Sequence, residues 1–427
     1  MPARREIFRE RWRMIFAPCW KTALAACIAV LAVSTASAAE VADFSNPIHG
    51  YLTRPPLDRF TRLKTELDAG RITLDAGSEK AFLVSLLGAL EVPVSSQMLA
   101  YSAISLQSRR ISPSNPRAIF FNDDTYVAWV PGGQIEIASL DPDLGSIFYL
   151  LDTVKAGQRP QSARSDRCMN CHAGPYTHRV PGLVVESVVP SITGGGVSAF
   201  RREQSGHGIP LELRMGGWHV TGAAAFVKHH GNIVLEFPNA VRRERVIQPG
   251  ELFDLTRYPA ATSDLLAHLL HEHQVGAVNR LVEATYLARA CLQSAPDSPE
   301  LDTLARNVVR YLLFAEEVPL PAGGVAGDPA FKAAFLSTRK PATGGAALRD
   351  LDLRTRLLRH RCSYMIYSPA FTGLPAPLKQ RVFRLLGRAL SEPSPEAEYA
   401  YLPAAEKQAI RTILRETLPE LAAAWTR

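Results

Sequence analysis

Residues 118–138 read AIFFNDDTYVAWVPGGQIEIA, and this stretch predicts how the first half of the chain folds. Two β-prone runs, 118–121 and 125–130, are separated by a polar Asn/Asp segment. Pro131-Gly132-Gly133 then leads into a third run, 134–138. Short apolar runs joined by Asn, Asp, Gly and Pro are typical of strands connected by hairpin turns. We therefore expect a β-rich region around this stretch.

Outward from this stretch, the pattern stays β-prone for some distance and then becomes helical. Further β-prone runs, 183–189 and 233–237 among them, place the β-rich region at residues 93–258, and a helical segment at 39–92 precedes it. From residue 259 to 427 apolar residues recur at helical spacing. The predicted helices there cover 262–292, 299–316, 328–336, 347–359, 377–390 and 403–425. The sequence thus predicts an α+β fold, in which a β-rich N-terminal half packs against a mainly helical C-terminal half.

The first 38 residues have the features of a secretory signal peptide. A basic stretch ends at Lys21, an apolar run covers 23–33, and Ala36-Ser37-Ala38 gives a small-x-small cleavage pattern. We expect export to the periplasm with cleavage near Ala38; the alternative is a leader that is kept as a membrane anchor. Without residues 1–38 and their six cations and two anions, 42 Lys and Arg face 39 Asp and Glu. This near-neutral balance gives no electrostatic reason to expect a nucleic-acid partner.

Residues 168–172 read CMNCH and match the attachment motif for haem c. Two thiols separated by two residues can bond the two vinyl groups of one haem, and the next histidine is then the proximal ligand of the iron. A thioredoxin-like pair has no need of that histidine, and a four-ligand zinc site needs a second ligand pair. We therefore expect one covalent haem c in a loop of the β-rich half, bound by Cys168, Cys171 and His172.

Two further cysteines remain in the exported chain, because Cys19 and Cys27 lie in the leader. Cys291 and Cys362 are suited to a disulfide in an oxidising compartment. Their positions in the sequence do not show whether they meet in space.

The motif does not specify the sixth ligand of the iron, and three residues are candidates. Met215 carries a soft sulfur donor, and His229 lies at a turn before a β-prone run. His273 lies in the apolar stripe of the first long predicted helix, where an imidazole needs a partner such as iron, a carboxylate or a carbonyl. A satisfied core histidine is the more common outcome there. His268, His271 and His273 do not form one metal site, because His271 points almost opposite His273 on the helix.

Candidates for catalysis are His273, Arg280 and Asp123. Arg280 lies two turns after His273 on the same helical face, an arrangement similar to the His/Arg pair above the haem of peroxidases. In the other interpretation, Arg280 pairs with an acid such as Asp123, Asp124 or Glu283. Asp123 and Asp124 suit general acid–base or metal chemistry, although turns between strands often have the same composition.

Several phrases of the sequence carry a resemblance to a known family. They include FNDDTYV at 121–127, CMNCHAG at 168–174, GGWHVTG at 216–222 and CSYMIYS at 362–368. With these phrases the chain resembles an uncharacterised family of exported bacterial cytochrome c domain proteins with a single CxxCH motif. The resemblance implies export and haem binding by the cysteines and histidine of the motif, and it implies no reaction.

Two functions follow from a single exported haem. The first is electron transfer in the periplasm, with a redox protein or a small-molecule electron donor or acceptor as partner. The alternative is a peroxidase-like haem enzyme with an open or labile sixth iron position, which would make use of the large helical half. A haem-based sensor is a third, weaker hypothesis. A chain of 427 residues is long for carrying one electron, whereas a soft sixth ligand such as methionine suits a carrier.

Overall fold

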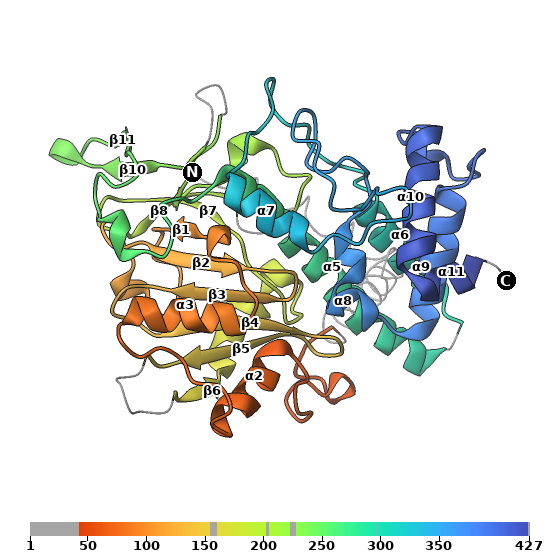
Figure 1. Ribbon diagram of the computed structural model, residues 1–427, viewed down its shortest axis with the longest axis horizontal. Coiled ribbons are helices and arrows are strands. Elements are labelled where there is room, and N and C mark those ends of the chain that lie inside the picture. The colour runs from red at the N-terminus through yellow and green to blue at the C-terminus, as the bar shows by residue number, and fades with distance from the viewer. Residues whose placement is uncertain (1–41, 154–159, 202–204, 223–227, 296, 426–427) are drawn as a thin grey trace, which may run out of the picture. The chain divides into compact units, whose positions relative to one another are not determined.

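The β-prone stretch found in the sequence folds as the centre of an antiparallel meander (Figure 1). The computed structural model describes residues 42–153, 160–201, 205–222, 228–295 and 297–425; the predicted signal peptide and its cleavage site near Ala38 lie outside these residues. Strands β1 to β6 are neighbours in the sheet in the order of the chain, and β9 pairs with β1. The strands are β1 (Met98–Ala100), β2 (Arg117–Phe121), β3 (Thr125–Trp129), β4 (Ile135–Asp141), β5 (Gly145–Leu151), β6 (Ser162–Arg164) and β9 (Trp218–His219).

The three runs predicted within residues 118–138 are confirmed as β2, β3 and β4. Strand β5 was not among the predicted strands, and it forms the longest pairing with β4, from Ile135 opposite Leu151 to Asp141 opposite Gly145. Gly145 has φ +83, and a Cβ there would lie 2.8 Å from the Val282 side chain of the helical half. The turn into β5 therefore requires glycine both for its backbone and for its close approach to a helix.

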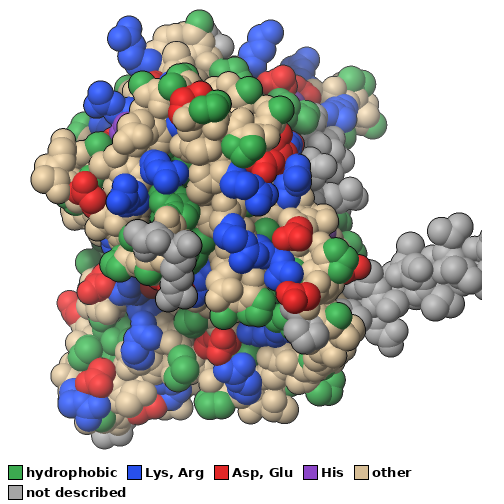
Figure 2. Space-filling view, turned by 90° about the vertical axis from the view of Figure 1, so that its right-hand side faces the viewer, with side chains coloured by type: hydrophobic (Ala, Val, Ile, Leu, Met, Phe, Trp, Pro, Cys, Tyr) green, Lys and Arg blue, Asp and Glu red, His purple; other side chains and the backbone are tan. Residues whose placement is uncertain are grey.

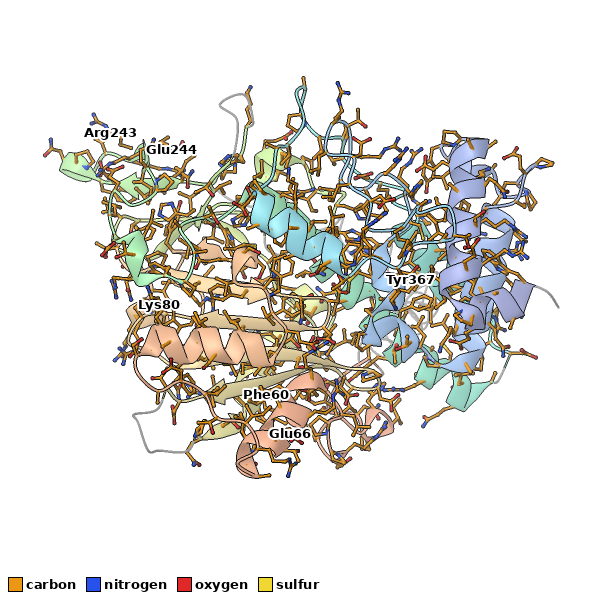
Figure 3. All side chains as sticks on the ribbon, viewed as in Figure 1. Phe60, Glu66, Lys80, Arg243, Glu244 and Tyr367 are labelled. Atoms are coloured by element: carbon orange, nitrogen blue, oxygen red, sulfur yellow. The ribbon has the colours of Figure 1, made fainter. Side chains whose placement is uncertain are left out.

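The two faces of this sheet are buried to different extents. One face lies under α2 (Arg59–Asp68) and α3 (Glu79–Ala89), as Figure 1 shows. On that face the ring of Phe60 packs 4.6 Å from the ring of Tyr149, and Figure 3 shows Phe60 on α2 beside the sheet. Residues of β2 to β5 that point to this face are almost fully buried, whereas several on the opposite face are only half-buried.

Two small hairpins complete the β-rich half. They are β7 (Ser187–Pro190) with β8 (Gly196–Arg201), and β10 (Ile233–Glu236) with β11 (Arg243–Val246). The β-prone runs at 183–189 and 233–237 correspond to β7 and β10. A short helical segment, α4 (Met169–His172), carries the end of the CMNCH motif between β6 and β7.

The C-terminal half is helical, so the predicted α+β class is confirmed. Its longest helix starts at the N-cap Asp264, whose carboxylate accepts a hydrogen bond from Leu266 N, and it is buried on nearly all sides over its first half. On the face seen in Figure 2, cationic and anionic side chains are interspersed. The helices are α5 (Leu265–Ser294), α6 (Glu300–Leu312), α7 (Pro329–Ser337), α8 (Pro369–Thr372), α9 (Ala376–Ala389), α10 (Ala404–Thr417) and α11 (Pro419–Trp425).

Two helix predictions in this half were wrong. Residues 347–359 form no helix, because the Asp352 carboxylate accepts the N–H groups of Arg354 and Thr355 and holds a turn. The predicted helix 403–425 is broken into α10 and α11 at Pro419, which has no N–H to continue the helical hydrogen bonds. Among the described residues, no helix is both long enough and apolar enough to span a membrane.

We expect Phe60→Ala to lower the free energy of unfolding by about 3–4 kcal/mol, because it leaves a cavity between α2 and the sheet. Urea unfolding followed by circular dichroism measures the effect. The control is Val84→Ala on α3, where the side chain is 41% exposed and a change within about 0.5 kcal/mol is expected. Equal effects of the two variants would contradict the packing described for this face.

Candidate functional site

The CMNCH motif lies on a short helical turn that is docked against β5. Cys168 is half-buried and Cys171 is exposed, and both are free thiols. Ser165 N donates to Phe148 O at 2.9 Å, which ties the start of the loop to β5. The hydroxyl of Tyr51 donates to Met169 Sδ at 3.3 Å. These contacts hold both thiols on one turn without joining them to each other, as attachment to a single ligand requires.

His172 is held by one hydrogen bond that fixes the role of each ring nitrogen. Nδ1 lies 3.0 Å from Gly182 O, and a carbonyl can only accept, so Nδ1 carries the proton. Burial lowers the pKa of His172 to about 4, so the ring is neutral at pH 7. In the described part of the chain, Nε2 of His172 has no hydrogen-bond partner. The result is a neutral imidazole whose Nε2 lone pair is free for a metal, with its second nitrogen held by a carbonyl, as is usual for metal-binding histidines.

Gly182 is itself fixed from the helical half. Asn279 of α5 accepts from Leu183 N and donates to Leu183 O, each at 2.8 Å, so it clamps the residue after Gly182. A Cβ on Gly182 would lie 2.6 Å from Asn279 Oδ1 and 2.9 Å from Thr177 Cβ. Gly182 N also donates to His172 O at 2.8 Å. The orientation of His172 therefore depends on a glycine and on a helix about a hundred residues further along the chain.

The half-buried face of the sheet lies beside this histidine, whose ring is 4.3 Å from the ring of Phe148 on β5. Strand register places Ile119 opposite Ala128, Ala128 opposite Glu136, and Glu136 opposite Leu150, so these side chains share one face. We call this surface the open sheet face; it consists of the half-buried residues Arg117, Ile119, Ala128, Glu136, Ala138 and Leu150. Apolar and small side chains in the middle of a sheet are normally covered, so this face suits a flat apolar ligand.

One end of the open sheet face is polar. Arg117 and Glu136 form an ion pair at 2.9 Å, and Ser105 and Gln107 also donate to Glu136. Nε of Arg117 is buried and has no partner among the described residues. A haem carries two carboxylates at one edge, and this unused donor is suited to one of them. The thiols, the free Nε2, the apolar surface and the arginine together fit haem c.

The structure separates the sequence candidates for the sixth ligand. Met215 is buried and lines a small cavity with Trp218 and His271. His229 is half-buried, and its Nδ1 accepts from Gly231 N at 2.9 Å. Met215 therefore faces a small cavity that it shares with His271, whereas Nδ1 of His229 is occupied by a hydrogen bond within its own turn.

His273 is fully buried in the middle of α5. Its Nδ1 lies 2.8 Å from Nδ1 of His207, and its Nε2 lies 2.8 Å from Ser363 Oγ. Its ring stacks on Phe314, with ring centres 4.6 Å apart. Because both ring nitrogens have partners, His273 is the satisfied core histidine that its apolar stripe also allowed, and it has no nitrogen free for iron.

Among the described residues, Arg280 forms no ion pair with Asp123, Asp124 or Glu283, the acids named as its possible partners. It donates to Ser205 O at 3.2 Å and Gly276 O at 3.0 Å, and its guanidinium lies 4.3 Å from the ring centre of Tyr311. It lines a polar cavity with residues 176–178, which follow the motif. The His273–Arg280 pair therefore lacks an open imidazole with which to act on a haem ligand.

The two aspartates of the β2–β3 turn join the sheet to other parts of the fold. Asp123 pairs with the buried Arg349 of the helical half, whose guanidinium lies 4.3 Å from the ring centre of Tyr364. Asp124 forms two hydrogen bonds with Arg59 of α2, at 2.8 and 3.0 Å. Both carboxylates are therefore engaged by arginines, and this favours a structural role over acid–base catalysis.

The remaining histidines and cysteines of the described residues do not gather into one cluster. In the described ranges, no three His, Cys, Asp or Glu side chains come together as a metal-binding group. Cys291 and Cys362 are separate free thiols, and Cys362 is fully buried. The possible disulfide between them is not formed in this structure.

Comparison with known proteins gives no match to this chain. No protein-family model matches it, and neither curated proteins nor solved structures show a significant match. The resemblance carried by the sequence phrases therefore stays a prediction, and the function is argued from the residues of the site.

We expect Asp123→Asn to lower the free energy of unfolding by about 2 kcal/mol, because Arg349 would keep a buried charge without its anion. The matched control is Asp68→Asn, which removes an exposed ion pair with Lys64 and should cost about 0.5 kcal/mol or less. Urea unfolding of both variants measures the difference. If the variant unfolds like wild type and loses redox activity instead, Asp123 has a chemical role.

Proposed function

We propose that this protein is an exported cytochrome c-like protein that binds one covalent haem at Cys168, Cys171 and His172 and transfers electrons in the periplasm. The observation that carries the proposal is the hydrogen bond from Nδ1 of His172 to Gly182 O, which leaves a neutral Nε2 free. A thiol pair used for disulfide exchange has no need of this arrangement.

Covalent attachment would be an addition of the two thiols to the two vinyl groups of the haem, with no other reactant. Each S–H adds across one vinyl C=C; the sulfur bonds to one carbon and the proton goes to the other, so no net oxidation or reduction occurs. The bound haem would supply an iron that cycles between ferric and ferrous states. His172 would supply a nitrogen ligand to it, the open sheet face would pack against its flat surface, and Arg117 would provide charge and a donor for a carboxylate.

Electron transfer is favoured over the peroxidase-like alternative by the positions of the polar residues. A peroxidase needs an open iron position beside an imidazole and a cation that can polarise peroxide. His273 is fully hydrogen-bonded, and Arg280 donates to backbone carbonyls. The partner is then a redox protein or a small electron donor or acceptor that approaches from the exposed Cys171 side of the motif. Contact with a membrane would follow only from a retained leader.

Covalent attachment is tested by the mass of the denatured protein from cells that mature c-type cytochromes. We expect the wild type to carry the mass of one haem, and the Cys168→Ala/Cys171→Ala variant to have the bare peptide mass. The matched control is Cys291→Ala, which removes a half-buried thiol outside the motif and should keep the haem. Haem retained by the double variant, or absent from the wild type, would contradict the proposal.

The choice between carrier and enzyme is tested on the haem-loaded protein. We expect a reversible potentiometric titration with a one-electron slope, and no oxidation of an added electron donor by peroxide above the rate of a haem-free control. Peroxide turnover that depends on the folded protein would favour the enzyme instead. The same titration on Asn279→Ala should show a shifted potential, because the clamp on the Gly182 carbonyl that orients His172 is lost.

A further inference from the structure

One buried histidine of α5 has no hydrogen-bond partner. His271 is 7% exposed, and its ring lies edge-on to Phe121 at 5.2 Å and to Tyr126 at 5.6 Å between ring centres. Within the described residues, neither of its ring nitrogens forms a hydrogen bond. An imidazole whose ring nitrogens have no hydrogen-bond partner in the protein can bind a ligand through one of them.

The neighbouring histidines of the same helix show the contrast. His268 Nε2 lies 3.0 Å from His219 O and 3.1 Å from Ser263 Oγ. His273 has partners on both of its nitrogens. Among these three histidines, only His271 has both nitrogens without a hydrogen bond.

His271 lies on the same side of the sheet as His172. Register places Phe148 opposite Ala138 and Ala138 opposite Tyr126, so one row of the open face runs from the ring under His172 to the ring under His271. Phe148 on β5 and Tyr126 on β3 are two strand spacings apart, which is about 10 Å. Ala138 on β4 lies between them, and its methyl group is the smallest side chain of any residue other than glycine.

Helix α5 contacts both the sheet near Tyr126, through His271, and the loop that holds His172, through Asn279. Asn279, which clamps the loop that holds His172, lies eight residues after His271, or about 12 Å along the helix axis. His271 also lines a small cavity together with Met215 and His268. The same rigid element thus sets the position of one imidazole and of the carbonyl that orients the other.

We infer that His271 is the sixth ligand, so that His172 and His271 together would hold the haem iron. This inference rests on the proposed function, because it needs the haem. It adds that the resting ferric iron is bound by two imidazoles, which suits electron transfer without a bound substrate. Met215, which shares the cavity, then packs beside the site rather than binding the iron.

The test is the spin state of the ferric haem in matured protein, measured by optical absorption and electron paramagnetic resonance. We expect low-spin wild type, and high-spin haem in both His271→Ala and His271→Gln. Added imidazole should return His271→Ala to low spin, because it fills the space that the side chain leaves. The controls Met215→Leu and His229→Ala should stay low-spin.

Each other result overturns the inference. A low-spin spectrum kept by the two His271 variants, a change confined to Met215→Leu, or a high-spin wild type would each remove His271 from the iron. These failures leave the proposed function intact, provided that mass spectrometry shows covalent haem. A wild type without covalent haem overturns both.

A second readout needs no haem. In the Cys168→Ala/Cys171→Ala background, His271→Leu should raise the urea midpoint, because an apolar group replaces an imidazole that lacks a hydrogen bond. A lowered midpoint would show that His271 makes a stabilising contact within the fold and is not reserved for a ligand.

Discussion

The hydrogen bond between His172 Nδ1 and Gly182 O is the constraint on which the site depends. It chooses the tautomer of His172, and its acceptor is positioned by Asn279 of α5. A motif in the β-rich half is thereby oriented by the longest helix of the C-terminal half. This connection gives the helical half a role in the site even though its own histidine and arginine candidates are engaged elsewhere.

The two faces of the sheet are buried to different extents, and this difference leaves a surface beside the motif. One face is sealed under α2 and α3, whereas the open sheet face leaves Ile119, Ala128 and Ala138 half-buried beside the motif. Small and apolar side chains in the centre of a sheet lose stabilisation when they are left in contact with water. A flat, apolar cofactor bound there would recover that stabilisation, so the proposed haem would also complete the core on this side of the sheet.

The sequence predicted those parts of the fold that local pattern determines. Strands β2 to β4 were found because they are short β-prone runs separated by turn residues, and the CMNCH motif was found because its chemistry is contained within five residues. Residues 347–359 have helical composition, but the Asp352 turn, a local side-chain contact, overrides it. The residues that orient His172 could not be predicted from the sequence, because Gly182 and Asn279 are brought together only by tertiary packing. Helix α5 is buried almost all round, so periodicity marked the stripe of His273 and could not show that His271 faces the sheet.

The seating of the cofactor is tested most directly by a crystal structure of the matured protein with an anomalous iron signal. The iron should lie within bonding distance of His172 Nε2 and over the open sheet face, with the Nδ1 hydrogen bond to Gly182 O intact. Iron located away from Ala138, or a His172 ring turned so that Nδ1 no longer meets that carbonyl, would contradict it.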